Sequence, residues 1–294
     1  MSTKRGRIDT RSLGLDLGTS LMRFLTGREI LHYGLWKNGQ DVCAANLRVA
    51  QEAYTEKLFG FLPPGRLTIL DIGGGCGETA RGLQALGHSV EIVVPSEVLA
   101  ERCKAIAGPL TRIHCVPFEG FASERRFDVC LFSESFQYIA IDLAFDNAAA
   151  HLTDRGEILI ADCFRTEAFG QDLTEHGLVG GGHSLASFRR ILASRPLEIV
   201  FEEDITELVA PSVELEQQFF NMIGSVSLRI DQDLRIAFPK SRWLATKVLW
   251  ALLGKRRRTR LERRLLGNHR NAEMFCRYNR YLMMKIRQTP AGRG

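Results

Sequence analysis

Short apolar runs alternate with helix-like segments from Leu67 onward, and this alternation constrains the fold more than any other feature of the chain. Six runs have the near-continuous apolar composition of strands that are covered on both faces, at 67–71, 89–94, 112–116, 127–132, 157–161 and 197–203. The segments between them predict helices at 78–86, 96–107, 142–152 and 184–192. This order predicts an α/β fold built on a doubly wound, mainly parallel sheet.

The segments before and after these strands divide the chain into three expected parts: an N-terminal lid, a core and a cap. Upstream, a helical stretch at 41–62 ends at Pro63-Pro64-Gly65, so 1–62 is expected to form an N-terminal helical lid. Downstream, helices at 213–222, 243–253 and 256–266 precede a seventh strand at 281–287. We therefore expect a seven-stranded core made of 63–208 and 276–288, with a helical cap at 209–275 inserted before the last strand.

A glycine-rich loop, Asp71-Ile72-Gly73-Gly74-Gly75-Cys76-Gly77, follows the first strand and opens a helix. Ligands of open α/β sheets bind at this edge. The spacing of the glycines disfavours a dinucleotide, because the third glycine of that fingerprint would fall on Glu78. Asp71 and Glu78 would repel a pyrophosphate and would suit a ligand with an ammonium and a sulfonium group, such as S-adenosylmethionine. The alternative is a glycine turn without a ligand.

These residues resemble the first motif of class I S-adenosylmethionine-dependent methyltransferases, a family with a Rossmann-like fold. Two further segments resemble its small-molecule and lipid-directed members, nearest to the tocopherol methyltransferase and cyclopropane synthase-like groups. Phe132-Ser133-Glu134-Ser135-Phe136-Gln137-Tyr138-Ile139 is similar to their S-E-x-x-E-H-[IM] segment, and His32-Tyr33-Gly34-Leu35-Trp36 is similar to an H-[YH]-G-x-W segment that folds over the cofactor. The resemblance covers roughly residues 30–205 and the last strand.

The resemblance implies the cofactor S-adenosyl-L-methionine, the product S-adenosyl-L-homocysteine and a set of contact residues. These are Tyr33, Trp36, Asp71, Gly73, Gly75, Gly77, Ser96, Phe118, Glu119 and Ser133. The sequence departs from the family at Val94, where many relatives carry an acidic residue for the ribose, so Ser96 or Glu97 would have to help. It also has Gln137-Tyr138 in place of a Glu-His pair. For Phe118 and Glu119, an ordinary loop position is the alternative.

Methyl transfer needs alignment and exclusion of water more than a dedicated base, but a hydroxyl acceptor requires a group that takes its proton. Of the seven histidines, His183 is the best placed, in a glycine run after the fifth strand. Glu134 and Tyr138 are the other candidate catalytic residues. Asp162 could orient His183 or hold an acceptor amine. The alternative for His183 is a structural role at the start of the next helix.

Positive charge is concentrated in one part of the chain. Residues 229–294 hold 18 Lys/Arg and 4 Asp/Glu, which leaves 39−18=21 and 34−4=30 for residues 1–228. Two tryptophans, Trp243 and Trp250, stand beside the cationic cluster 255–260. This pattern is compatible with peripheral membrane contact or a lipid-like acceptor, a phosphorylated acceptor, or RNA, which is the least favoured. The alternative is a helix packed within the cap, with solvated arginines.

The remaining features indicate a cytoplasmic enzyme. No apolar stretch is long enough to span a membrane, no secretory signal is present, and the seven scattered cysteines indicate reduced thiols. No metal-ligand spacing is present. We expect methyl transfer to a small-molecule or lipid-like biosynthetic acceptor, on oxygen, nitrogen or carbon. A homodimer is compatible with the sequence. An RNA-directed methyltransferase and a non-catalytic cofactor-binding subunit are the alternatives.

Overall fold

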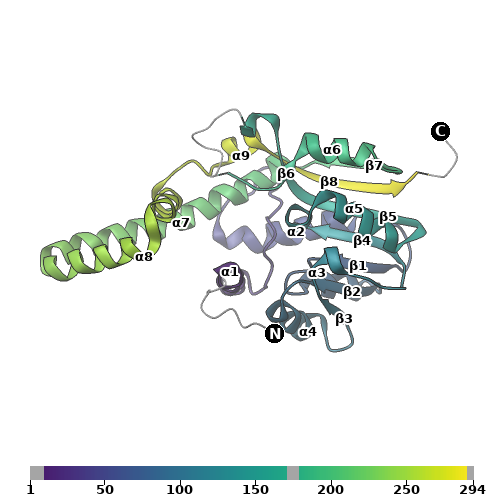
Figure 1. The fold of residues 1–294 in the computed structure, drawn as a ribbon, viewed down its shortest axis with the longest axis horizontal. Helices are drawn as coiled ribbons and strands as arrows, with labels where there is room; N and C mark the ends of the chain where they lie inside the picture. Colours follow the sequence, from purple (N-terminus) through teal and green to yellow (C-terminus); the bar gives the residue numbers. More distant parts are fainter. Residues whose placement is uncertain (1–9, 171–178, 290–294) are drawn as a thin grey trace.

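The computed structural model describes residues 10–170 and 179–289, in which one mixed sheet carries helices on both faces (Figure 1). The strands are β1 (Thr68–Ile72), β2 (Ser89–Val94), β3 (Arg112–Cys115), β4 (Phe127–Ser133), β5 (Leu152–Arg165), β6 (His183–Ser184), β7 (Leu197–Asp204) and β8 (Asn279–Gln288). Their order is β3-β2-β1-β4-β5-β8-β7, with β6 paired to β5. Only β8 runs antiparallel to its neighbours. The prediction of a doubly wound, mainly parallel sheet is confirmed.

The strands contain near-continuous apolar runs because both faces of the sheet are covered. In β4, Val129 and Leu131 enter one core cluster, while Cys130 and Phe132 enter the other. The first cluster is covered by α2 (Leu47–Phe59), α3 (Glu78–Ala85), α4 (Glu97–Ala107), α7 (Thr206–Ala237) and α9 (Ala272–Tyr278). The second is covered by α5 (Ile141–His151) and α6 (Leu185–Ala193). Burial of both side-chain sets fixes the register of the sheet.

The N-terminal part consists of α1 (Thr10–Thr26) and an extended segment at 27–43, called the lid below. α1 is attached to α4 through Arg102, which pairs with Asp16 at 3.1 Å and with Glu29 at 2.9 Å. The lid then crosses from the glycine loop toward α7 before the chain enters α2. This course places the lid over the carboxyl ends of β1 and β4.

Of the helices predicted before the last strand, those at 243–253 and 256–266 match the two parts of one helix that is interrupted at Gly254, whereas the one at 213–222 is longer than predicted. Instead of a helix at 213–222, α7 continues to Ala237, and α8 (Pro239–Leu266) returns antiparallel to it with a break at Gly254. α7 continues past Gly224 because the missing side chain allows close packing, since a Cβ there would lie 2.2 Å from the carbonyl oxygen of Leu265. Much of this α7–α8 hairpin projects away from the sheet (Figure 1).

Candidate active site

The glycine loop adopts a backbone that L-residues with side chains avoid. Gly73, Gly75 and Gly77 have φ values of +73°, +56° and +90°. A Cβ on Gly73 would lie 2.4 Å from the Ser135 Cβ, so a side chain at this position is also excluded by steric clash. At Gly75, in contrast, no heavy atom lies within 4 Å of such a Cβ. The loop therefore presents bare backbone to open space at Gly75, beside the carboxyl ends of the strands.

Asp71 provides a buried carboxylate at the base of this loop. Its side chain is 1% exposed, and its Oδ2 atom has no hydrogen-bond partner among the described residues. Burial raises the pKa of Asp71 to about 7. Gly74 allows the carboxyl group to sit there, because a Cβ would lie 2.6 Å from Oδ2. An orphaned acid under a glycine loop is suited to a cationic ligand.

Glu134 lies at the end of the neighbouring strand β4, and it is the only non-glycine residue with a positive φ, +53°, within 10–170 and 179–289. Its Oε1 atom accepts hydrogen bonds from the Tyr33 backbone N–H at 2.8 Å and from the Tyr281 hydroxyl at 2.9 Å. Burial, more than the nearby Asp162, raises the pKa of Glu134 to about 8. A strained, buried acid in this place is typical of a functional site.

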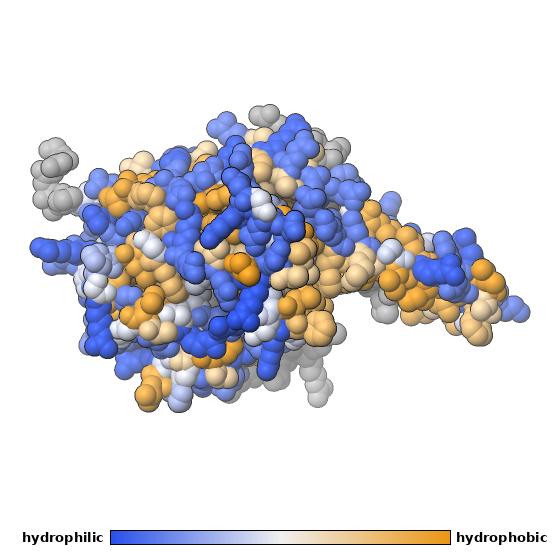
Figure 2. All heavy atoms as spheres, turned by 180° about the vertical axis from the view of Figure 1, so that it is seen from behind, coloured by the Kyte–Doolittle hydropathy of each residue, from blue (hydrophilic) through white to orange (hydrophobic). Residues whose placement is uncertain are grey.

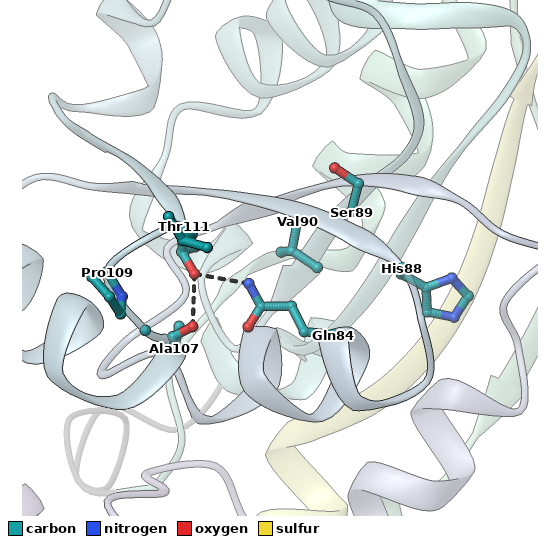
Figure 3. Close-up of a pocket in the computed structure, with 9 residues that line it drawn as sticks. Gln84, His88, Ser89, Val90, Ala107, Pro109 and Thr111 are labelled. Carbon is teal, nitrogen blue, oxygen red and sulfur yellow. Dashed lines mark hydrogen bonds between the residues drawn. The ribbon is translucent and has the colours of Figure 1, made fainter.

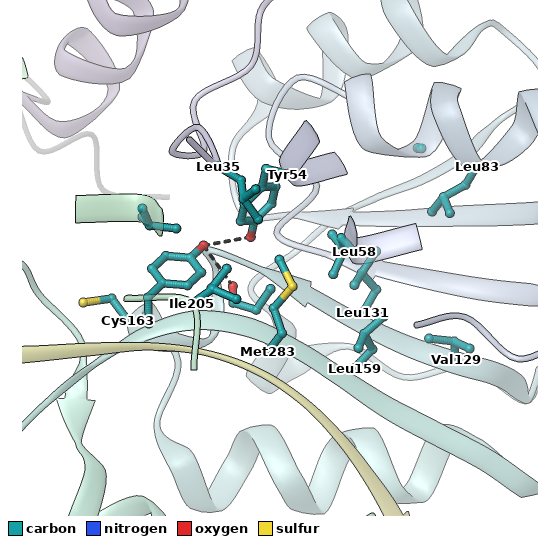
Figure 4. Close-up of a cluster of buried hydrophobic side chains, with 14 of the residues drawn as sticks. Leu35, Tyr54, Leu58, Leu83, Val129, Leu131, Leu159, Cys163, Ile205 and Met283 are labelled. Atoms are coloured by element: carbon teal, nitrogen blue, oxygen red, sulfur yellow. Dashed lines mark hydrogen bonds between the residues drawn. The ribbon is translucent and has the colours of Figure 1, made fainter. Parts of the chain in front are cut away.

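Two tyrosines extend the network behind Glu134. The hydroxyls of Tyr54, on α2, and Tyr281, on β8, are 2.7 Å apart (Figure 4). Tyr54 also approaches the hydroxyl of Ser133 at 3.4 Å. Neither tyrosine is recognisable as a site residue from the sequence, because no motif connects positions that lie 227 residues apart. The Tyr281 hydroxyl thus holds the carboxyl group of Glu134, and Tyr54 in turn holds the Tyr281 hydroxyl.

The first half of the lid is tied to the glycine-loop side of the sheet. Arg28 pairs with Glu78 at 3.4 Å, and the Glu29 backbone N–H donates to the same carboxylate at 3.4 Å. His32 stacks on Tyr54 with ring centroids 4.3 Å apart, and burial lowers the pKa of His32 to about 4. Gln51 donates to the backbone carbonyl of His32 at 3.0 Å. These contacts give His32 a structural role in the lid.

The second half of the lid is anchored on α7. The Oγ atom of Ser212 accepts hydrogen bonds from the Gly34 N–H at 2.9 Å and from the Trp36 indole N–H at 2.8 Å. Trp36 is 3% exposed and packs with Leu47 and Ala50. Its indole thus holds the lid to α2 and α7. No local pattern around Ser212 marks this residue as the partner of Trp36.

His183 contacts the turn that follows Glu134. Its Nε2 atom lies 2.8 Å from the carbonyl oxygen of Ile139 and 3.2 Å from that of Phe136, so Nε2 carries the proton and donates. Asp162 holds the same turn, accepting from the backbone and side-chain amides of Gln137 at 3.0 and 2.9 Å. Burial raises the pKa of Asp162 to about 7. Both residues therefore position the segment that carries Glu134.

The other predicted site residues lie at varied distances from this centre. Tyr138 is 64% exposed, whereas Phe118 is 3% exposed and packs against Phe121 and Phe132. Ser96 precedes α4 and its side chain makes no capping hydrogen bond, while Glu119 is exposed in the turn after β3. The predicted roles of these four residues stay predictions.

An arginine pair lies beyond Tyr33, at the base of the hairpin. Arg264 and Arg270 contact the two carboxylate oxygens of Glu216, at 2.5 and 2.6 Å. The Tyr33 ring packs edge-on against Phe275, with centroids 6.0 Å apart. Burial is the main cause that raises the pKa of Tyr33, and the Glu216 charge adds to it. Sequence reasoning treated these arginines only as part of a general positive charge.

A separate hollow lies at the opposite edge of the sheet, between the end of α3 and the end of α4 (Figure 3). Gln84 donates to the Thr111 hydroxyl at 2.8 Å, and this hydroxyl donates to the carbonyl oxygen of Ala107 at 2.7 Å. Its polar groups are thus engaged with one another. The hollow contains neither Asp71 nor Glu134, so the candidate site is the one under the lid.

Solved structures share this architecture at low sequence identity. A provisionally assigned sarcosine dimethylglycine methyltransferase from Galdieria sulphuraria has a TM-score of 0.64 and 17% identity, covering 93% of this chain and 99% of its own. Geranyl diphosphate C-methyltransferase from Streptomyces coelicolor A3(2), solved with S-adenosyl-L-homocysteine, scores 0.62 with 15% identity and 92% coverage of both chains. The cyclopropane synthase MmaA2 from Mycobacterium tuberculosis scores 0.64 with 18% identity, covering 92% and 95%.

Sequence comparison gives the family directly. A comparison with curated proteins found no match. The family model described as a methyltransferase domain, however, matches residues 43–196, which is more than half of the chain and includes the glycine loop and Glu134. The matched segment runs from the end of the lid to the residues just before β7. The chain therefore belongs to the methyltransferase domain family.

Proposed function

We propose that the protein transfers a methyl group from S-adenosylmethionine to a small-molecule or lipid-like acceptor in a cytoplasmic, natural-product type of biosynthetic pathway. The observation that carries the proposal is the placement of Glu134. Its buried carboxyl group lies at the tip of β4, next to the glycine loop of β1, and is held from above by the lid. An acid so placed faces the region where acceptor and cofactor must meet.

The residues present fit this cofactor. Gly75 offers open space and bare backbone, and Asp71 has a buried oxygen without a partner, both suited to the ammonium-bearing part of the ligand. When bound, S-adenosylmethionine supplies a methyl group on a cationic sulfonium. The carboxyl groups of Asp71, Glu134 and Asp162 then make the site acidic and complementary to this charge. The Gly73, Gly77 and Ser133 positions complete the wall of the site.

Glu134 is the group of this chain that takes or holds the acceptor's proton. Its pKa of about 8 lies close to neutral pH, where a base combines a useful ionised fraction with a strong pull on the proton. The Tyr33 N–H and the Tyr281 hydroxyl fix its Oε1 atom, so the carboxyl group cannot swing away. A hydroxyl or an acidic carbon requires this proton transfer, whereas an amine requires mainly orientation.

The lid supports catalysis by excluding water. It spans from Glu78 at the glycine loop to Ser212 on α7, so it covers the site from both ends. Displacement at a methyl group needs in-line alignment and a dry site, and a covered site provides both. The aromatic rings of Tyr33, Tyr281 and Phe275 give the space beside Glu134 an apolar wall, which favours an apolar acceptor.

Calorimetric titration with S-adenosylmethionine, S-adenosylhomocysteine and NAD tests the cofactor. Micromolar binding of the first two and none of NAD is the expected result, while absence of both would overturn the proposal. Incorporation of labelled methyl into fractions of a cell extract then tests turnover. Label in a low-molecular-weight or lipid fraction supports the proposal. Label in RNA alone would contradict the proposed acceptor class. Cofactor binding without a labelled product in any fraction would contradict the proposed activity.

A further inference from the structure

The distal part of the α7–α8 hairpin has no packing partner in the described structure. Figure 1 shows it leaving the body of the molecule beyond the level of α1 and α2. None of the described side chains between 225 and 263 is buried. A two-helix projection of this kind gains little from its own packing, since helices derive most of their stability from burial of an apolar face.

Large apolar side chains are nevertheless concentrated on this projection, as the orange areas of Figure 2 show. The two tryptophans, Trp243 and Trp250, are 57% and 50% exposed. The other exposed apolar side chains of this part are Met222, Ile223, Val226, Leu228, Ile230, Leu234, Ile236, Phe238, Leu244, Val248 and Leu261. An apolar surface this extensive marks a site of interaction with a partner or a membrane.

Positive charge surrounds the apolar side chains. Residues 229–266 contain 12 Lys/Arg and 3 Asp/Glu, a net charge of +9. Each of the three carboxylates already pairs with an arginine of the hairpin, for example Asp231 with Arg242 at 2.7 Å. Of the remaining basic groups, Arg264 pairs with Glu216 at the base of the hairpin, and residues 229–266 contain no further carboxylate for the others. The surface therefore attracts an anionic partner at distances up to the screening length.

The tryptophans and the basic side chains are arranged as at a membrane interface. The Lys247 ammonium lies 3.9 Å from the ring centroid of Trp243, and the Arg258 guanidinium lies 3.7 Å from that of Trp250. Tryptophan is enriched at the headgroup level, where its ring is half apolar and half wet, and long basic side chains reach from there toward phosphates. Each pair thus combines both parts of an interfacial anchor.

An exposed apolar face of this size can bind either a second copy of the chain or a membrane, and the charge of the hairpin distinguishes the two. A second copy of the chain would bring its own segment 229–266, with a net charge of +9, against the same segment of the first copy, whereas an anionic lipid surface complements this charge. Within residues 10–170 and 179–289, no helix has the length and apolar composition required to cross a membrane. The contact is therefore one that lies on the surface of the bilayer.

We propose that the α7–α8 hairpin docks the enzyme on anionic lipid bilayers through the exposed apolar and basic side chains of residues 222–263. α7 also connects this surface with the lid, because Ser212 at its base accepts hydrogen bonds from Gly34 and Trp36. Docking thus holds the covered site close to the membrane surface. The inference stands on the hairpin itself and is independent of the identity of the methyl acceptor.

Co-sedimentation of the full chain with vesicles tests the inference. Vesicles that contain phosphatidylglycerol should carry the protein down, vesicles of phosphatidylcholine alone should not, and high salt should weaken binding to the first kind. The double variant Trp243→Ser/Trp250→Ser should reduce the affinity at least ~10-fold. The double variant Arg257→Glu/Arg260→Glu should reduce it by a similar factor.

Matched variants on the body serve as controls. Val98→Ser/Leu110→Ser removes two exposed apolar side chains, and Arg126→Glu removes an exposed charge, and both should leave vesicle binding unchanged. S-adenosylhomocysteine titration of every variant checks the fold and tests the proposed function separately. Equal sedimentation of wild type and both hairpin variants would overturn the inference. So would a wild-type dimer that the tryptophan variant converts to a monomer, because the face would then join two copies.

Discussion

The backbone N–H of Tyr33 donates a hydrogen bond to Oε1 of Glu134 at 2.8 Å, across 101 residues of sequence. This contact connects the lid with the tip of β4, and the Tyr281 hydroxyl binds the same oxygen from below at 2.9 Å. One carboxylate oxygen thus serves as the anchor of the lid, while the burial of the group raises its pKa to about 8. The position of the lid and the protonation state of Glu134 are therefore physically coupled.

Glu134→Gln should abolish proton transfer while it keeps both hydrogen bonds, because an amide oxygen accepts as a carboxylate does. We expect methyl incorporation to fall about 100-fold, a typical contribution of a general base, with S-adenosylhomocysteine affinity changed by less than about threefold. The wild-type rate should rise with pH up to about 8, since the base must be ionised, and this rise should be absent in the variant. Glu124→Gln, at an exposed carboxylate outside the site motifs, is the control. A wild-type rate in Glu134→Gln would exclude the assignment.

Asp71 should make the ligand-free protein less stable as pH rises. Its pKa of about 7 in the fold exceeds the ordinary value of 3.8, so the folded state binds more protons between these pH values. The free energy of unfolding therefore falls with rising pH in this window, by up to about 1.4 kcal/mol per pH unit. Asp71→Asn should remove the share of this slope that Asp71 contributes, as measured by urea unfolding from pH 4 to 7, while Glu134 and Asp162, whose pKa values are also raised, keep the remainder. Cofactor affinity should increase with pH in the wild type and be weak at every pH in the variant.

Gly75→Ala and Gly87→Ala form a matched pair for locating the cofactor. Both residues have positive φ, +56° and +91°, and neither has a heavy atom within 4 Å of an added Cβ. Each substitution should cost about 1 kcal/mol of stability through backbone strain. Only Gly75→Ala should also weaken S-adenosylhomocysteine binding, by at least ~10-fold, because its methyl group would occupy the space that the ligand needs. Equal affinities in calorimetry would place the cofactor elsewhere.

The variant His183→Ala tests whether His183 positions the turn beside Glu134 or acts as the general base. The variant removes the donor from the carbonyl oxygens of Phe136 and Ile139, two buried residues, and should lower the free energy of unfolding by about 2 kcal/mol. The rate should fall because the turn beside Glu134 loosens, but the pH at which the rate rises should be unchanged. A pH–rate profile that loses one limb in the variant would instead identify His183 as the proton acceptor.

The sheet and the glycine loop follow directly from the sequence. β1, β4 and β5 are covered on both faces, so each contains a near-continuous apolar run that marks it as a buried strand. The glycines at 73, 75 and 77 are needed where the backbone has positive φ, so the loop carries a local signature. Both features depend on residues that are close together in the chain, and that is why the pattern alone predicted them.

The network around Glu134 has no such signature. Tyr54 and Tyr281 meet only because α2 lies beside the start of β8, and Ser212 meets Trp36 only because α7 lies beside the lid. The course of α7 was also unpredictable, since Gly224 indicates a helix end locally but serves here as a close contact with α8. Long-range packing decided each case.

Ser212→Ala should loosen the lid without touching the cofactor. The variant leaves two buried donors, the Gly34 N–H and the Trp36 indole N–H, without their acceptor, so we expect a loss of about 2 kcal/mol in unfolding free energy. Because the lid covers the site, S-adenosylhomocysteine affinity should decrease about tenfold and proteolysis within 27–43 should accelerate. Ser225→Ala, which removes an exposed hydroxyl bonded to the Met222 carbonyl on the same helix, should change neither. If both variants behave alike, the lid is held by its glycine-loop contacts with Glu78 rather than by α7.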